Sequence, residues 1–313
     1  MSGSDEWQVI DRFFNHLGAV RTDVVLGIGD DAALLRPAAG MEIAQTTDSL
    51  IEQVHFLAGA PPRSLGHRAL AVNLSDLAAM GATPAWALLS LTLPAVDESW
   101  LAEFAAGFGR LARLHEVALV GGNLSRGPLN ITVQLTGLVP AGSALRRSGA
   151  RAGDEIWVSG TLGDAAMGRL PEASEALRAR FEYPTARVAL GSALRGIASS
   201  CIDLSDGLLA DLPRLAQASG CGAILELDRL PRSPALQASA AALSWQRALV
   251  GGEDYELCFT VPPESAARLS ALARQLEVAL CCCGRLRPAA GLELRAAGGV
   301  IQFSQSRFDH FKS

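Results

Sequence analysis

Apolar residues recur along the chain with two periods, and their alternation predicts an α/β protein. Runs with a period near 3.6 residues are typical of amphipathic helices, and short apolar runs bounded by Gly, Pro, Asp or Ser are typical of strands. In the first half of the chain, the helical period predicts helices at 6–17, from 63 to Gly81 and from Glu98, behind Asp97, to about His115. The short apolar runs there predict strands at 23–27, 42–47, 85–93, 117–120 and 129–139.

The segment PAGSALRRSGARAGD, residues 140–154, is rich in Gly, Ser and Arg and has no apolar period, which is typical of a domain junction. Beyond it, the pattern predicts strands in EIWVSG, GAILELD, YELCFTV and EVALCCCG, with helices near 164, at 186–196 and from CIDLSDG to Gly220. The 313 residues are about twice the usual domain length of ~150. We therefore predict two α/β domains, at 1–140 and 150–313.

Six short polar motifs interrupt the apolar pattern at predicted strand ends or turns. They are GIGDDAA, QTTDS, NLSD, GGNLSRG, IDLSDG and GGEDYEL. Asp, Asn, Ser and Gly make turns and cap helices, so each motif alone has a structural explanation, and Ser205 or Asp206 could be a helix N-cap. Asp76 differs, because it lies inside a predicted helix, three residues after Asn73, where Asp is a poor helix former.

The motifs have a chemical explanation if they converge, as strand ends of one α/β unit do. Two carboxylates ~4 Å apart repel by about 4 kcal/mol at an effective dielectric constant of 20, so a cluster would require cations. Only Arg36 and Arg126 lie within or beside the motifs. Carboxylate, hydroxyl and amide oxygens favour Mg²⁺ or Mn²⁺ over zinc. In GIGDDAA, the Gly-bordered turn lets the backbone approach a ligand while Asp30 or Asp31 holds a metal.

The scarcity of lysine excludes several classes of enzyme for this chain, because Lys312 is the only lysine. The chain has no lysine for a phosphate-binding loop, for a protein-kinase strand or for an internal Schiff base. An enzyme of this composition that moves phosphate would rely on Mg²⁺ and arginines, and Arg126 and Arg147 are candidates, although each could also be a surface residue. His55 could be structural or functional, and Glu253 follows a double glycine that suggests a close approach.

Charge and hydropathy limit the binding partners and the cellular compartment that we expect for the protein. The net charge is -5 without a basic cluster, which argues against nucleic acid as a partner. No run approaches the ~18 apolar residues of a membrane span, and the start MSGSDEWQVI lacks the layout of a signal peptide, so we expect no membrane partner and a cytoplasmic location. The six cysteines lack zinc-type spacing and are expected to be reduced thiols.

In order and spacing, GIGDDAALL, TTDSLIEQVHF, AVNLSDLAAMGATP, GGNLSRG, RRSGARAGD, IDLSDGLLADL and GGEDYELCFTV resemble the thiamine-monophosphate kinase family of the aminoimidazole ribonucleotide synthetase-like superfamily. The resemblance implies a two-domain α/β (α+β) fold with mixed sheets flanked by helices. It implies ATP-dependent phosphorylation of thiamine monophosphate to thiamine diphosphate, by direct in-line transfer with several Mg²⁺ ions. It also implies a homodimer formed through an N-terminal ATP- and Mg²⁺-binding domain, with a C-terminal domain that completes the active-site cleft.

The resemblance also implies roles for individual residues. No residue acts as a covalent nucleophile, and Arg126 and Arg147 stabilise charge. The positions that match metal ligands are Asp31, Thr46, Thr47, Asp48, Asp76, Asn123, Asp203 and Asp206. The positions that match ATP contacts are Gly121, Gly122, Arg147 and Ser205, and those that match substrate contacts are His55, Glu253 and Gln305.

Two positions depart from the family pattern. Asn123 stands where the family usually has Asp, which predicts weaker metal binding, and Gln305 stands where the family tends to have an aromatic residue, for which Phe303 or Phe308 could substitute. These departures leave open a non-catalytic nucleotide- and Mg²⁺-binding paralogue. Other phosphoryl-transfer members of the superfamily fit less well: no cysteine precedes Cys201, the C-terminus DHFKS has no cysteine, and GGEDYEL argues against an aminoimidazole ribonucleotide synthetase.

Overall fold

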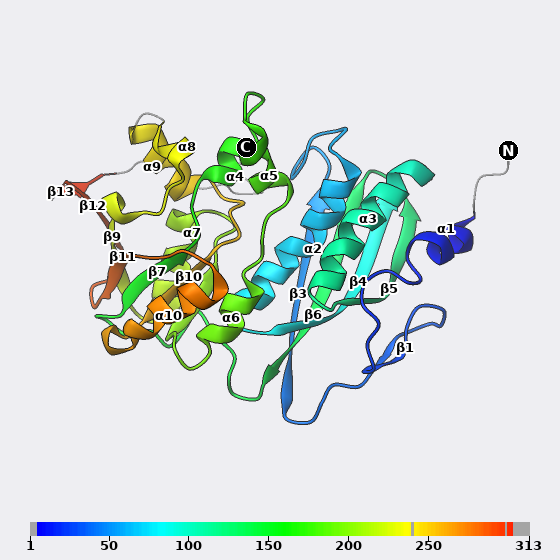
Figure 1. Cartoon of the computed structure of the whole chain (residues 1–313), viewed down its shortest axis with the longest axis horizontal. Coiled ribbons are helices and arrows are strands. Elements are labelled where there is room, and N and C mark those ends of the chain that lie inside the picture. Colours follow the sequence, from blue (N-terminus) through cyan, green and yellow to red (C-terminus); the bar gives the residue numbers. More distant parts are fainter. Residues whose placement is uncertain (1–4, 239–240, 298, 303–313) are drawn as a thin grey trace. The chain divides into compact units, whose positions relative to one another are not determined.

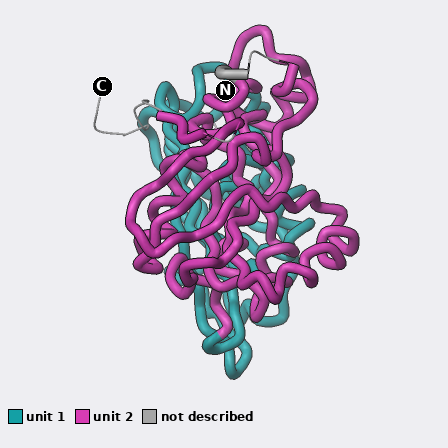
Figure 2. The backbone as a smooth tube through the Cα atoms, turned by 90° about the vertical axis from the view of Figure 1, so that its left-hand side faces the viewer, with its two compact units in different colours: residues 1–77, 82–142 teal, residues 78–81, 143–313 magenta. Residues whose placement is uncertain are grey.

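The computed structural model describes residues 5–238, 241–297 and 299–302. The chain forms two compact units, coloured separately in Figure 2. Unit 1 comprises residues 1–77 and 82–142, and unit 2 comprises residues 78–81 and 143–313. The division at 142/143 lies inside the glycine-rich segment 140–154.

Unit 1 is built on a four-stranded sheet with the order β3-β6-β4-β5. Its strands are β3 (Met41–Ile51), β4 (Thr83–Leu93), β5 (Ala118–Arg126) and β6 (Asn130–Pro140). β6 pairs antiparallel with both β3 and β4, whereas β4 and β5 are parallel. The parallel pair is joined by α3 (Glu98–Leu114), which packs beside α2 (Pro62–Ala79) over one face of the sheet (Figure 1).

The side chains of this sheet alternate between the two faces. In β6, Ile131, Val133 and Leu135 are fully buried, while Thr132 and Gln134 are only partly buried. Because successive strand residues point to opposite faces, one face packs under the helices and the other carries Thr132 and Gln134. We call the second face the open face.

Close contact between α2 and α3 explains a glycine in each helix. A Cβ on Gly66 would lie 2.1 Å from the carbonyl oxygen of Phe104, and one on Gly107 would lie 1.9 Å from that of Arg63. Only a residue without a side chain permits this approach.

The N-terminal part of unit 1 contains α1 (Glu6–Phe13) and the two-stranded ribbon of β1 (Val24–Leu26) and β2 (Leu34–Leu35). α1 begins with a capping box in which Asp5 and Gln8 bond each other's backbone N–H groups. The helix ends at Phe13, earlier than its apolar pattern predicts.

Unit 2 is built on a seven-stranded sheet with the order β13-β12-β9-β11-β7-β10-β8. All neighbouring strands are antiparallel except β9 and β12. The strands are β7 (Glu155–Ser159), β8 (Ser200–Asp203), β9 (Gly222–Glu226), β10 (Leu257–Val261), β11 (Leu280–Arg287), β12 (Leu292–Ala296) and β13 (Gly299–Ile301). The helices are α4 (Asp164–Gly168), α5 (Glu175–Glu182), α6 (Val188–Leu194), α7 (Leu208–Ala218), α8 (Pro234–Gln237), α9 (Ala241–Val250) and α10 (Ala267–Leu276).

The core of unit 2 lies on both faces of its sheet. Cys258 of β10 packs in one apolar cluster, with Leu212 of α7, whereas its neighbour Phe259 packs in another, with Leu190 and Leu269 of α6 and α10. Alternate residues of one strand thus enter different cores, so helices cover the sheet on both sides.

The fold confirms the expectation of mixed sheets flanked by helices, but two details of the sequence interpretation are wrong. TTDS lies inside β3 and GGNLSR lies inside β5, although both were expected at strand ends or in loops. Thr47 and Asn123 within these strands are exposed, so polar side chains are tolerated there. All six cysteines are free thiols, as expected. None of the helices in the described residues is long and apolar enough to span a bilayer.

Candidate functional site

Asp76 is joined to β3 by a side-chain contact within unit 1. The Thr46 hydroxyl donates to the Asp76 carboxylate. Asp76 is half-buried, whereas every other residue from Arg68 to Ala79 in α2 is buried. Asp76 is therefore the only residue of that stretch of helix that is not buried. This supports the sequence prediction that Asp76 differs from the other polar residues of the motifs. Asn73 on the same helix is instead a core residue whose Nδ2 donates to the carbonyl of Ala69, 3.0 Å away.

Strand register separates the other predicted ligands of unit 1. One row of paired residues runs across the sheet from β3 to β5. In order, it contains Thr47 of β3, Gln134 of β6, Leu88 of β4 and Gly121 of β5. Thr47 and Gly121 thus occupy one row across the sheet but on its two outer strands. The Thr47 hydroxyl donates to the carbonyl of Val133 at 3.2 Å.

The double glycine of β5 has a structural cause. Gly122 has φ +155°, and a Cβ there would lie 1.9 Å from the carbonyl oxygen of Leu89 on β4. A side chain at this position would therefore disrupt the pairing of β4 with β5. Asn123, the next residue, is exposed and lies opposite Ser90.

A pocket of about 950 Å³ covers part of unit 1's open face. Asp31, Gly121, Gly122 and Asn123 contribute to its lining, together with Trp7 and Ile10 of α1. Its lining combines apolar walls with a few amide, hydroxyl and carboxylate groups, which is typical of a small-molecule site.

His55 follows β3 in a tight turn with a fixed ring. The backbone N–H of Ile51 donates to His55 Nδ1 at 3.1 Å, and Arg68 Nη1 donates to the His55 carbonyl at 3.4 Å. Gln53 in the same turn has φ 66°. Because Nδ1 accepts a hydrogen bond, the neutral ring carries its proton on Nε2.

In unit 2, the IDLSDG motif joins β8 to α7. Asp203 is the buried last residue of β8, and Asp206 receives a hydrogen bond of 2.7 Å from Arg214 Nη1. The N-cap of α7 is Gly207 without a side-chain cap, so the suggestion that Ser205 or Asp206 caps the helix is wrong. Arg214 was missed from the sequence because it lies two helical turns beyond the motif.

A second carboxylate, Asp211, lies under the same turn. Its Oδ2 accepts the backbone N–H of Asp206 at 3.0 Å, and its Oδ1 accepts from Arg214 at 2.7 Å. Burial, followed by the neighbouring charge of Asp206, raises the pKa of Asp211 to about 6. Asp211 is therefore a structural support for the turn that carries Asp206.

The GGEDYEL motif is hydrogen-bonded to the IDLSDG motif along its backbone. The backbone N–H of Leu204 donates to the carbonyl of Glu256 at 2.8 Å, and the N–H of Tyr255 donates to the carbonyl of Leu204 at 2.9 Å. The N–H of Glu253 donates to the carbonyl of Ser205 at 2.8 Å. Glu253 and Tyr255 have φ 63° and 50°, which is uncommon for residues with side chains. The Tyr255 hydroxyl donates to Glu253 Oε2 at 3.1 Å.

The two other acids of GGEDYEL anchor the loop to the interior of unit 2. Asp254 accepts the backbone N–H groups of Gly163 at 2.7 Å and Ala165 at 3.3 Å, and burial raises its pKa to about 7. Glu256 is fully buried and accepts from Arg187 twice at 2.6 Å and from Arg180 at 3.0 Å. Sequence reasoning missed this arrangement because the arginines lie far from the motif along the chain.

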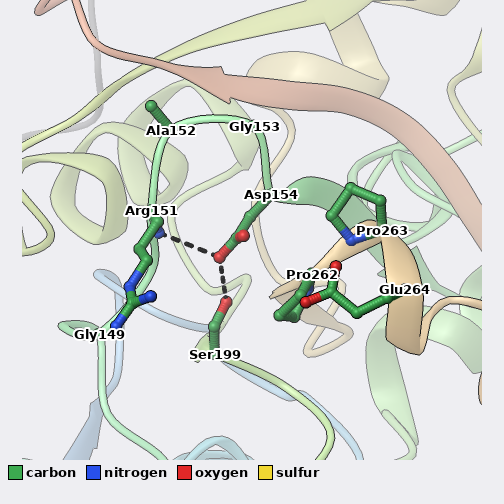
Figure 3. Close-up of a pocket in the computed structure, with 9 residues that line it drawn as sticks. All are labelled: Gly149, Arg151, Ala152, Gly153, Asp154, Ser199, Pro262, Pro263 and Glu264. Carbon is green, nitrogen blue, oxygen red and sulfur yellow. Dashed lines mark hydrogen bonds between the residues drawn. The ribbon is translucent and has the colours of Figure 1, made fainter.

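Another pocket, of about 570 Å³, lies in unit 2 (Figure 3). It is lined by Gly149, Ser199 and residues from 151–154 and 262–264. Its buried Asp154 accepts the backbone N–H of Arg151 at 3.0 Å and the hydroxyl of Ser199 at 2.6 Å. These bonds close the turn before β7. None of the residues predicted to bind a ligand lines this pocket.

Arg126 ends β5 and is exposed, and Arg147 is exposed with its carbonyl accepting from the Ser219 hydroxyl at 3.0 Å. Gln305 lies outside the described residues, as do Phe303 and Phe308.

Among residues 5–238, 241–297 and 299–302, no group of three or more His, Cys, Asp or Glu side chains could hold a metal ion. The predicted convergence of carboxylates is therefore not observed in this part of the chain. The metal-ligand roles remain a prediction.

Two family models match the chain, AIR synthase related protein, N-terminal domain, over residues 29–139 and AIR synthase related protein, C-terminal domain, over residues 151–296. A thiamine-monophosphate kinase of Salmonella typhimurium is 45% identical over 98% of both chains. The crystal structure of thiamine-monophosphate kinase from Stenotrophomonas maltophilia is 44% identical, with a TM-score of 0.84 over 90% of this chain and 93% of that one. A structure described as AaThiL complexed with AMPPCP and TMP is 33% identical, with a TM-score of 0.77 over 88% of this chain and 89% of that one.

Proposed function

Because the chain belongs to the thiamine-monophosphate kinase family, we propose that it transfers the γ-phosphoryl group of ATP to the phosphate of thiamine monophosphate, releasing thiamine diphosphate and ADP. The chain is thus a phosphotransferase with ATP as co-substrate. The absence of any lysine before Lys312 is consistent with a mechanism in which arginines and metal ions neutralise the phosphates.

The observation that carries this function is the contact between Thr46 and Asp76. A carboxylate in the interior of a helix costs helix stability, and here it lies at the one opening of an otherwise buried stretch, bonded to a hydroxyl of the neighbouring strand. Neither turn formation nor helix capping explains it. A role for the two side chains as oxygen ligands of a hard cation does explain the contact.

The oxygen donors of the motifs fit Mg²⁺ in their chemistry. The residues that would hold the ions are Asp31, Thr46, Thr47, Asp48, Asp76, Asn123, Asp203 and Asp206. Mg²⁺ would supply neutralisation of the phosphate charge and alignment of the two phosphates. Asn123 would contribute one negative charge less than an aspartate.

The remaining roles concern substrates. Gly121, Gly122, Ser205 and Arg147 would contact ATP, and Arg126 and Arg147 would stabilise charge on the transferring group. His55 would donate from Nε2 to the substrate phosphate, because Ile51 occupies Nδ1. Glu253 would face the cationic thiazolium or the amino group of the pyrimidine. Gln305 is retained as a substrate contact, and no residue acts as a covalent nucleophile.

The organisation of the enzyme is part of the proposal. The N-terminal domain, 1–140, would bind ATP and Mg²⁺ and form a homodimer, and the C-terminal domain, 150–313, would complete the active-site cleft. The open face, with exposed Leu88 and Ile43, is a surface suited to a second copy. We place the enzyme in the cytoplasm and expect no nucleic-acid partner.

The test is ADP release from Mg-ATP with and without thiamine monophosphate. The proposed function requires ADP release that depends on thiamine monophosphate, in equal amount to thiamine diphosphate formed. Nucleotide binding without turnover would instead identify a non-catalytic paralogue.

A further inference from the structure

Arg214 of α7 joins two carboxylates at the turn between β8 and α7. Its Nη1 lies 2.7 Å from Asp206 Oδ2 and 2.7 Å from Asp211 Oδ1. The backbone N–H of Asp206 closes this ring of contacts by donating to Asp211 Oδ2 at 3.0 Å. Asp206 is a predicted metal ligand, whereas Arg214 and Asp211 have no role in the proposed reaction. We call these three residues the Asp206 triad.

Burial explains only one of the two bonds that Arg214 makes. The Asp211 side chain is 1% exposed, and a buried carboxylate is costly without a paired charge. Arg214 lies three residues later on the same face of α7 and supplies that charge. The Asp206 side chain, in contrast, is 34% exposed and that of Arg214 is 44% exposed. Their contact is a solvent-exposed ion pair, which contributes little stability.

Both members of this exposed pair keep bonding capacity that the fold does not use. Among the described residues, none donates a hydrogen bond to Asp206 Oδ1, and Arg214 donates only through Nη1. A carboxylate oxygen of this kind suits a hard cation, so Oδ1 can bind Mg²⁺ while Oδ2 stays bonded to Arg214. The Nε and Nη2 atoms of Arg214 can donate to a phosphate.

The charge of the Asp206 triad opposes a metal ion that arrives alone. Two carboxylates and one guanidinium carry one net negative charge, which a divalent ion would reverse. Without the guanidinium, the two carboxylates would match the charge of the ion. At a given distance, a divalent ion repels Arg214 twice as strongly as a monovalent ion does. A nucleotide removes this obstacle, because the negative charge of its phosphates offsets both the ion and the guanidinium.

Orientation of Asp206 by Arg214 is an effect of opposite sign. A carboxylate that is held by a hydrogen bond binds a metal ion more tightly, because its oxygen is already in place. An exposed ion pair fixes its members weakly, so this benefit is small at Asp206. The repulsion, in contrast, acts on the full double charge of the ion. We therefore expect repulsion to exceed orientation.

We propose that Arg214 is an internal counter-ion of Asp206, which weakens the binding of Mg²⁺ alone and makes metal binding at Asp206 depend on the nucleotide phosphates. Arg214 acts through Asp206 and is a positioning residue for the metal. Because binding free energies are reciprocal, the nucleotide also binds more tightly when the metal is present. The inference rests on the proposed function, because that function assigns Asp206 to a metal ion.

Mn²⁺ binding in the absence of nucleotide tests the counter-ion directly. Electron paramagnetic resonance measures free Mn²⁺, and thermal unfolding verifies that each variant is folded. We expect Arg214→Gln to bind Mn²⁺ about tenfold more tightly than the wild type, because one positive charge is removed from the site. Arg214→Lys keeps the charge and should bind Mn²⁺ as the wild type does.

Asp211→Asn changes the charge in the opposite direction. The amide keeps the size of the side chain but removes a negative charge, so Mn²⁺ binding should weaken about tenfold. The double variant Asp211→Asn/Arg214→Gln restores the net charge of the triad and should bind Mn²⁺ within about threefold of the wild type. The double variant also leaves no buried carboxylate unpaired. If Arg214→Gln alone does not fold, the comparison of Asp211→Asn with the double variant measures the effect of Arg214.

A bound nucleotide should remove most of the difference between the wild type and Arg214→Gln. With the ATP analogue AMPPCP at saturating concentration, the two proteins should bind Mn²⁺ with affinities within about threefold of each other. Titrations of AMPPCP without protein correct for the Mn²⁺ that the nucleotide binds by itself. The wild type therefore gains more from the nucleotide than the variant does.

Two controls confine the effect to Asp206. Arg287→Gln removes another arginine of unit 2, one that pairs with Glu293, and should leave Mn²⁺ binding unchanged. In an Asp206→Asn background, Arg214→Gln should have no further effect on Mn²⁺ binding, because the carboxylate through which Arg214 acts is absent.

The proposal is overturned if removal of the Arg214 charge does not tighten Mn²⁺ binding in the absence of nucleotide, or if Arg214→Lys shows the same gain. An equal gain in Arg287→Gln or in the Asp206→Asn background overturns it as well. If Asp206→Asn binds Mn²⁺ as the wild type does, with and without AMPPCP, the metal does not contact Asp206 and the proposal fails. If the wild type does not phosphorylate thiamine monophosphate, the proposed function fails, and these titrations still decide the role of Arg214 because they need no turnover.

Discussion

The two units hold their predicted ligand-binding residues by different means. In unit 1, these residues lie in or beside strands of the four-stranded sheet, and a pocket covers part of the sheet's open face. In unit 2, both faces of the sheet are covered, and the residues lie in loops anchored by buried carboxylates such as Asp254 and Glu256. Substitutions in unit 1 should therefore impair activity with little loss of fold, whereas substitutions at the anchors of unit 2 should impair folding.

The largest expected effect is at Glu256. Glu256→Gln removes the buried partner of Arg180 and Arg187, and an uncompensated buried charge costs about 3–5 kcal/mol. We expect a loss of that size in the free energy of unfolding, measured by urea denaturation. Glu293→Gln is a matched control, because Glu293 pairs with Arg287 and Arg295 near the surface of the same unit and should cost far less stability. Equal losses in the two variants would contradict the view of Glu256 as an interior anchor.

Asp76→Asn should separate activity from folding. The amide keeps the size of the side chain and can still bond Thr46 but removes one negative charge from the predicted metal site. We expect turnover to fall by about 100-fold or more, equivalent to about 2.7 kcal/mol, with the melting temperature unchanged within a few degrees. Steady-state kinetics and thermal unfolding of the same preparation provide the check. A rate like that of the wild type would remove Asp76 from the metal site.

Tyr255→Phe tests a smaller effect in unit 2, on the loop itself. The variant keeps the buried ring but loses the hydroxyl that donates to Glu253. One hydrogen bond to a carboxylate contributes about 1 kcal/mol or more, so we expect the KM for thiamine monophosphate to rise about fivefold, with kcat and the KM for ATP little changed.

Two comparisons make this result specific. Tyr183→Phe removes the other tyrosine hydroxyl of the chain and should leave the KM for thiamine monophosphate unchanged. In a Glu253→Gln background, Tyr255→Phe should have little further effect, because the hydroxyl acts through Glu253. Additive effects of the two substitutions would show that Tyr255 does not position Glu253.

The smallest expected effect concerns the departure from the family at Asn123. Asn123→Asp adds one negative charge on exposed β5. We expect the Mg²⁺ concentration for half-maximal rate to fall about threefold, since one further carboxylate oxygen favours a hard cation. Titration of the rate with Mg²⁺ at saturating substrates measures this midpoint. An unchanged midpoint would mean that Asn123 does not contact a metal ion.

The sequence by itself predicted most of the helices and strands, and it singled out Asp76 as an aspartate inside a helix. These features are local, because apolar period, capping residues and glycines act within a few residues of each other. The family resemblance, carried by the order of the polar motifs, assigned the reaction before any geometry was known.

Only the tertiary structure decided how the motifs are arranged. The sequence interpretation assumed strand ends that meet at one edge, but the sheets are mixed and largely antiparallel, so the β3 and β5 motifs lie in opposite outer strands. It could not reveal the partners Arg180 and Arg187 of Glu256, or Arg214 of Asp206, because those contacts depend on how helices pack against loops. Strand order and side-chain pairing across long sequence separations arise from packing of the whole unit, and no local pattern encodes them.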